Sequence, residues 1–148
     1  MRVLAVDPGE KRLGLALSDP SGMIANPLKV IQHISRPVDA AQIAQIALEH
    51  GAELIVIGQA LDSEGLPTPS SRRSARLAAA VRAQTNIPVI LWDESHSTRA
   101  AQQARRAMGA RRSQRAGHLD ALAATYILQT YLDCQAEQPS DPSSTNAP

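Results

Sequence analysis

The first nineteen residues constrain the fold more than any other part of the chain. Residues 3–6 are an apolar run typical of a central strand, and the run ends at the carboxylate of Asp7, followed by the turn-forming pair Pro8-Gly9. Residues 13–17 then alternate leucine with glycine and alanine, which predicts a second strand. We expect an antiparallel hairpin with Asp7 at the end of its inner strand. A carboxylate there must be solvated, paired or bound to a cation.

Composition limits the classes of protein that this hairpin can belong to. The chain has 148 residues, 43% of them hydrophobic, but aromatic residues make up only 2%, so aliphatic side chains must fill a single core. A single cysteine, Cys134, excludes an internal disulfide framework and a cysteine-based zinc site. No apolar run is long enough for a membrane span, and the start lacks a signal-peptide pattern. We therefore expect a cytoplasmic protein that does not associate with membranes.

Charge is nearly balanced overall but unevenly distributed. The formal net charge is +1, yet residues 95–119 contain no acid and six arginines: Arg99, Arg105, Arg106, Arg111, Arg112 and Arg115. This asymmetry favours a polyanion such as nucleic acid as the partner of one face, with an ordinary solvated basic face as the alternative. No aromatic residue lies among these arginines, which argues against readout of single-stranded bases by stacking.

The rest of the chain predicts alternating strands and helices. Pro27 places the strand predicted within residues 23–34 at a sheet edge, and Gly51 ends the helix that follows. The later segments are strand 54–57, surface loop 62–71, helix 74–83, strand 87–92, helix 98–108 and helix 116–134. The predicted fold is α/β, a five-stranded mixed sheet made of a three-stranded meander and two parallel strands, with helices on both faces. We expect one domain over residues 1–134 and a disordered polar tail over 135–148.

Three acids are expected to lie close together in this arrangement. Asp7 and the pair Asp93-Glu94 follow strands whose carboxyl ends lie at the same edge of the sheet, where ligands gather in such folds. Asp120 shares a helical stripe with apolar residues, which predicts that it faces the sheet. Three neighbouring carboxylates repel unless a cation is present, and oxygen ligands suit Mg²⁺ or Mn²⁺. Two such ions can activate water and stabilise the leaving oxygen of a phosphodiester.

Several motifs together resemble the YqgF/RuvX family. They are Asp7-x-Gly9-x-Lys11-Arg12-x-Gly14-x-Ala16-x-Ser18-Asp19, then Gly58-x-x-Leu61, then Asp93-Glu94, then the segment 120–132 beginning Asp120-Ala121-Leu122-Ala123-Ala124. The resemblance covers about residues 1–132. It implies an RNase H-like fold and a nuclease, assigned in this family to Holliday-junction resolution or to processing of precursor ribosomal RNA. It also implies that Asp7, Glu94 and Asp120 are the metal-binding catalytic acids.

The chain departs from the family pattern in two places. Gln59-Ala60 stands where the family usually has Leu-Pro, and Ser95-His96-Ser97-Thr98 stands where it usually has Arg-Leu-Thr-Thr. The loss of the arginine after Glu94 leaves open a second interpretation, a catalytically weak nucleic-acid-binding factor in transcription or ribosome assembly. A third, an ATP-binding protein of the actin type, shares the opening hairpin but needs a second domain for which this chain has no residues.

We predict a metal-dependent nuclease that acts on structured nucleic acid. Precursor 16S ribosomal RNA is the expected substrate by resemblance, so RNA is favoured over DNA, and a four-way DNA junction is the alternative. Lys11, Arg12, Arg111 and Arg112 are predicted to contact the nucleic-acid backbone, because arginine and lysine bind phosphate. The sequence is compatible with either a monomer or a homodimer, although a resolvase that cuts two symmetric strands would need a two-fold dimer.

Overall fold

A computed structural model describes residues 1–93 and 119–137. Within these ranges the strands are β1 (Val3–Pro8), β2 (Arg12–Ser18), β3 (Ala25–Gln32), β4 (Leu54–Gln59) and β5 (Val89–Asp93). The helices are α1 (Arg36–Glu49), α2 (Pro69–Arg82) and α4 (Leu119–Glu137). None of these helices combines the length and the apolar character that crossing a membrane requires.

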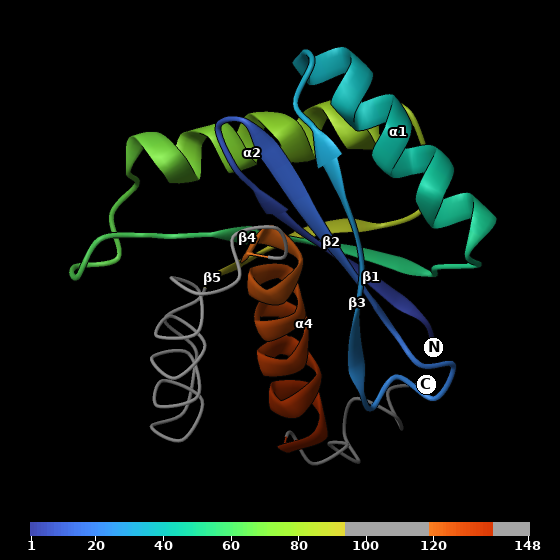
Figure 1. The fold of residues 1–148 in the computed structure, drawn as a ribbon. Coiled ribbons are helices and arrows are strands. Elements are labelled where there is room, and N and C mark those ends of the chain that lie inside the picture. Colours follow the sequence, from blue (N-terminus) through green and yellow to red (C-terminus); the bar gives the residue numbers. More distant parts are fainter. Residues whose placement is uncertain (94–118, 138–148) are drawn as a thin grey trace, which may run out of the picture.

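The five strands form one mixed sheet in the order β3-β2-β1-β4-β5 (Figure 1). β1 pairs antiparallel with β2, with Asp7 opposite Gly14, and β2 pairs antiparallel with β3. β4 pairs parallel with β1 through a register that sets Val6 opposite Ile57, and β5 extends the sheet in parallel beyond β4. The predicted meander plus two parallel strands is confirmed, and Pro27 lies in an edge strand, where its missing N–H interrupts no interior ladder.

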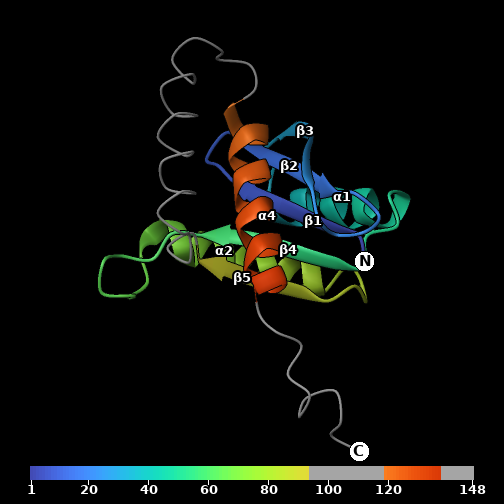
Figure 2. The same cartoon turned by 90° about the horizontal axis from the view of Figure 1, so that it is seen from below.

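Helices cover both faces of the sheet, as predicted (Figures 1 and 2). Alternate residues of β1 point to opposite faces. Leu4 and Val6 belong to the core under α1 and α2, whereas Val3 and Ala5 belong to the core under α4. The central strand is therefore apolar on both sides, which explains why its sequence is a continuous apolar run.

Helix α1 begins and ends at residues that favour those positions. The Ser35 side chain accepts a hydrogen bond from the Val38 N–H at the N-terminus, and Pro37 lies in the first turn. Gly51 follows the C-cap with φ +67°, a left-handed conformation that costs glycine little. The prediction that Gly51 ends this helix is confirmed.

The second helix begins earlier than predicted. Residues 62–71 read as a loop rich in proline and serine, but α2 begins at Pro69 and includes the last three of them. The Thr68 hydroxyl accepts from the Ser71 N–H, and the Ser71 hydroxyl lies 2.8 Å from the Thr68 N–H. This reciprocal capping box, with proline in the first turn, makes a polar stretch a helix start.

The remaining boundaries shift by a few residues. β5 begins at Val89 and includes Asp93, whereas residues 87–92 were predicted. α4 continues to Glu137, three residues beyond the predicted end at Cys134. The helix predicted over 98–108 lies outside the described residues.

Candidate functional site

Asp7 lies at the carboxyl end of the central strand, on the face that α4 covers. Because side chains alternate along a strand, Asp7 follows Val3 and Ala5, which pack under α4. Asp7 is half-buried, so it is reachable from solvent at the edge of the sheet. The strands on both sides of β1 hold its backbone in register, which fixes the position of this carboxylate.

The turn after Asp7 carries two exposed basic residues. The Gly9 N–H donates to the Arg12 carbonyl oxygen at 3.0 Å, and a Cβ on Gly9 would lie 2.4 Å from that oxygen. Glycine is therefore required for the tight turn. Lys11 and Arg12 are both exposed at its far side, where they can meet a large ligand.

Helix α4 approaches the same end of the sheet through Ile127. A Cβ on Gly58, near the end of β4, would lie 2.5 Å from Cδ1 of Ile127. Gly58 follows Ile57, the partner of Val6, so it neighbours Asp7 across the β1–β4 pair. Asp120 is the second residue of α4, about two turns before Ile127. Its backbone is described, and its side chain lies outside the described part.

The other predicted site residues cannot be placed. Glu94, Arg111 and Arg112 lie outside the described residues. Within the described ranges, no three side chains of His, Cys, Asp or Glu are grouped to hold a metal ion, and Asp7 is the one predicted ligand whose side chain is described. The clustering of Asp7, Glu94 and Asp120 stays a prediction.

Asp93 has a different position from Asp7. It ends β5 two residues after Leu91, which packs with the core under α1 and α2. By the same alternation Asp93 points to the face opposite Asp7. Trp92 points toward α4, where its Nε1–H donates to the Thr130 hydroxyl at 3.1 Å and its ring meets Tyr131 edge-on. Trp92 is thus a packing residue.

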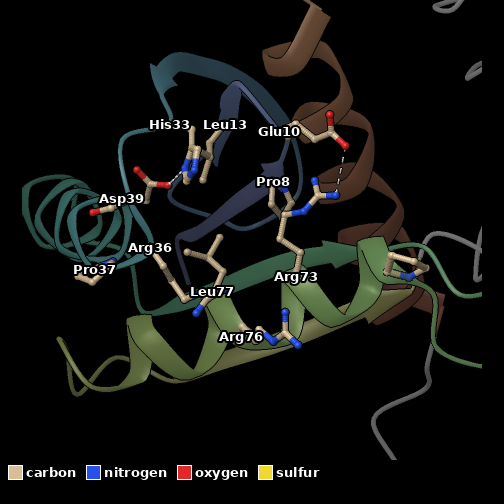
Figure 3. A pocket seen from close by; sticks show the side chains of 13 residues that line it. Pro8, Glu10, Leu13, His33, Arg36, Pro37, Asp39, Arg73, Arg76 and Leu77 are labelled. Atoms are coloured by element: carbon tan, nitrogen blue, oxygen red, sulfur yellow. Dashed lines mark hydrogen bonds and ion pairs between the residues drawn. The ribbon is translucent and has the colours of Figure 1, made fainter.

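A cavity of about 670 Å³ borders the same turn on the other face of the sheet (Figure 3). Sequence reasoning missed it, because its residues come from three separate segments. Pro8, Gly9 and Glu10 form one wall, the residues from His33 to Asp39 form the second, and the first turns of α2 form the third. Arginines contributed by both helices line it: Arg36, Arg73 and Arg76.

A buried carboxylate orders one wall of this cavity. Asp39 is 2% exposed, and its Oδ1 accepts from the Ile34 N–H at 3.0 Å while its Oδ2 pairs with Nδ1 of His33. These contacts hold the β3–α1 junction in place. The pair carried no recognisable sequence signal beyond an acid in the first turn of a helix.

Sequence comparison shows which known proteins resemble this chain. The model of a family described as "RuvX: Holliday junction resolvase" matches residues 1–134. A Syntrophus aciditrophicus protein named "Putative pre-16S rRNA nuclease" is 37% identical, covering 99% of each chain. A Geobacillus kaustophilus protein of the same name is 38% identical, covering 90% of this chain and 98% of its own.

Solved structures show the same fold at low sequence identity. Thermus thermophilus RuvC in complex with a Holliday junction substrate aligns with a TM-score of 0.61 at 16% identity, covering 93% of this chain and 96% of its own. The Fowlpox virus resolvase bound to Holliday junction DNA aligns with a TM-score of 0.57 at 10% identity, covering 93% and 100%. The RNase H-like fold is confirmed, and the matched family model shows that this chain belongs to the RuvX family.

Proposed function

We propose that this protein is a divalent-metal-dependent nuclease that processes precursor 16S ribosomal RNA in the cytoplasm. The observation that carries the proposal is Asp7, a solvent-reachable carboxylate fixed at the end of the innermost strand, beside a turn that presents two cations. Relatives more than 35% identical, covering most of the chain, carry the name of such a nuclease. Family membership and fold both support hydrolysis of nucleic acid.

The donor atoms suit a hard cation. Carboxylate oxygens are the ligands that Mg²⁺ and Mn²⁺ prefer, and Asp7 supplies a half-buried carboxylate at a strand end. Glu94 and Asp120 complete the proposed ligand set. When bound, such ions activate water and neutralise charge on the phosphoryl group.

The protein's own residues would position the substrate. Asp7 is held by two neighbouring strands, so it needs little reorganisation to bind its ligand. Lys11 and Arg12 would hold backbone phosphates on the exposed side of the turn, and Arg111 and Arg112 would extend that contact. Because these contacts are to phosphate, they would fix the register of the strand and carry no base specificity.

The test compares Asp7→Asn with Asp62→Asn, an exposed acid in the loop after β4. Each protein is incubated with a precursor 16S rRNA fragment and with a four-way DNA junction, in Mg²⁺, Mn²⁺ or chelator. We expect the wild type to cleave the RNA only when metal is present. The cleavage rate should fall at least about 100-fold in Asp7→Asn and stay unchanged in Asp62→Asn, because only the first change removes a ligand charge. Unfolding midpoints confirm that both variants fold.

Each other outcome has a defined meaning. Cleavage by Asp7→Asn at the wild-type rate overturns the assigned site. Preferred cleavage of the junction replaces ribosomal RNA by DNA as substrate. Binding of either substrate without cleavage favours a nucleic-acid-binding factor, in which Ser95-His96 has replaced residues that the chemistry needs.

A further inference from the structure

We propose that the cavity bounded by Arg36, Arg73 and Arg76 is a binding site for a phosphate group, separate from the site at Asp7. The two sites share the β1–β2 turn but lie on opposite faces of the sheet: Asp7 points toward α4, and the cavity opens beside α1 and α2 (Figure 3). The proposal does not depend on nuclease activity.

The charge of the cavity favours an anion. Its lining contains three arginines against two carboxylates, Glu10 and Asp39. The Asp39 carboxylate is 2% exposed, and both of its oxygens already have partners in the Ile34 N–H and His33. The first turns of α1 and α2 also line the cavity, and the positive ends of their dipoles add to the field.

Two of the arginines are available for a ligand. Among the described residues, neither the Arg36 nor the Arg76 guanidinium forms an ion pair or hydrogen bond. Figure 3 shows Arg36 extending from the start of α1 toward α2, so that cations from two helices approach the same space. Guanidinium groups bind phosphate through paired N–H donors, and convergence from separate elements is what such a site requires.

The third arginine is held by a weak partner that a phosphate could replace. The Arg73 Nη2 lies 3.6 Å from the Glu10 Oε1, and the Glu10 side chain is 82% exposed. An exposed ion pair at this distance contributes little to stability. His33 adds a further polar atom: its Nδ1 is engaged by Asp39, which leaves Nε2 on the opposite edge of the ring.

The size of the cavity admits more than a bare ion. About 670 Å³ lies within the range of sites for small organic ligands and is sufficient for a nucleotide. The phosphate could therefore belong to a free nucleotide or to the end of a nucleic-acid strand. Both sources present the same chemistry to the arginines, and the choice of probe separates them.

The experiment is calorimetric titration in chelator, so that metal-dependent chemistry does not contribute. The probes are inorganic phosphate, uridine 5′-monophosphate, and a short oligoribonucleotide with or without a 5′-phosphate. The variants are Arg36→Gln, Arg76→Gln and Glu10→Gln, with Arg72→Gln as the matched control, since Arg72 is an exposed arginine of α2 outside the cavity lining. Asp7→Asn shows whether binding is independent of the proposed nuclease site.

We expect saturable binding of at least one phosphate probe, about tenfold weaker in Arg36→Gln and in Arg76→Gln, because each loses a charge-assisted hydrogen bond. Arg72→Gln should bind every probe as wild type does, and Asp7→Asn should bind inorganic phosphate and the mononucleotide as wild type does. Glu10→Gln should bind more tightly, since a competing carboxylate is removed. Tightest binding of the mononucleotide identifies a free nucleotide, whereas a preference for the 5′-phosphorylated strand over its unphosphorylated form identifies a nucleic-acid end.

Two results would overturn the proposal. The first is that none of the phosphate probes binds saturably. The second is an equal loss in Arg72→Gln and Arg76→Gln, which would show that overall positive charge, and not this cavity, attracts the anion. If Asp7→Asn loses cleavage but binds phosphate unchanged, the two sites are independent. Cleavage therefore tests the nuclease site, and phosphate binding separately tests the cavity.

Discussion

Gly58 in β4 lies directly against Ile127 of α4, so closely that a Cβ on the glycine would be 2.5 Å from the Ile127 Cδ1. Ile127 is 1% exposed and packs in the core under α4, so a methyl group added at Gly58 would force its side chain to shift. This contact sets the distance between the helix that carries Asp120 and the strand beside Asp7.

Gly58→Ala should therefore destabilise the fold by about 1–3 kcal/mol, the usual cost of overpacking. Ile127→Val removes Cδ1 and should by itself cost about 1 kcal/mol. In the double variant the two costs should partly cancel, and a double-mutant cycle from urea unfolding measures the coupling. Simple additivity of the two losses would contradict a direct steric contact.

Replacing Asp39 should weaken the β3–α1 junction. Asp39→Ala removes a buried carboxylate that accepts from the Ile34 N–H. Because a hydrogen bond to a charged group contributes about 1.5–3 kcal/mol, we expect a loss of about 2 kcal/mol in the free energy of unfolding. Asp39→Asn retains an oxygen acceptor and should lose less. Denaturant unfolding of both variants provides the comparison, and equal losses would show that the charge matters more than the hydrogen bond.

Asp19 should make stability depend on pH at the acid end. The Ser21 hydroxyl, then the Ile24 and Met23 N–H groups, donate to its carboxylate and hold its pKa well below the usual 3.8. Because the folded pKa is lower than the unfolded one, the contribution is fully present above about pH 4 and is lost as pH falls toward the folded pKa.

The urea midpoints of wild type and Asp19→Asn measure this effect between pH 7 and pH 3. The wild type should be more stable at pH 7, and the difference should narrow below pH 4 as the carboxylate takes up a proton. A difference that stays constant over the whole range would show that the carboxylate's ionisation does not contribute.

Lys11 should contribute to nucleic-acid binding through charge alone. Lys11→Gln is expected to weaken binding of different sequences uniformly and to lower the slope of log K against log salt by about 1, the effect of one lost phosphate contact. Lys29→Gln, at an exposed position of the edge strand β3, is the matched control. Equal slopes for the two variants would place the nucleic acid elsewhere.

The sequence alone determined the order of the strands and the placement of Asp7. The signals were local, and each reports the environment of its own segment. They are the alternation in residues 13–17, the apolar run before Asp7 and the proline in β3. Gly51 likewise marked the end of α1 because only a left-handed residue fits there. The start of α2 was missed because a capping box gave helical structure to a stretch with loop composition.

Only the tertiary structure showed the arginine cavity and the contact between Gly58 and Ile127. Arg36 and Arg73 are 37 positions apart in the sequence, and nothing in either neighbourhood indicates that they line one space. Which side chains converge depends on how α1 and α2 pack on the sheet, a non-local property set by the volumes of the core residues beneath them. Local patterns predict the elements, whereas packing decides which of their side chains meet.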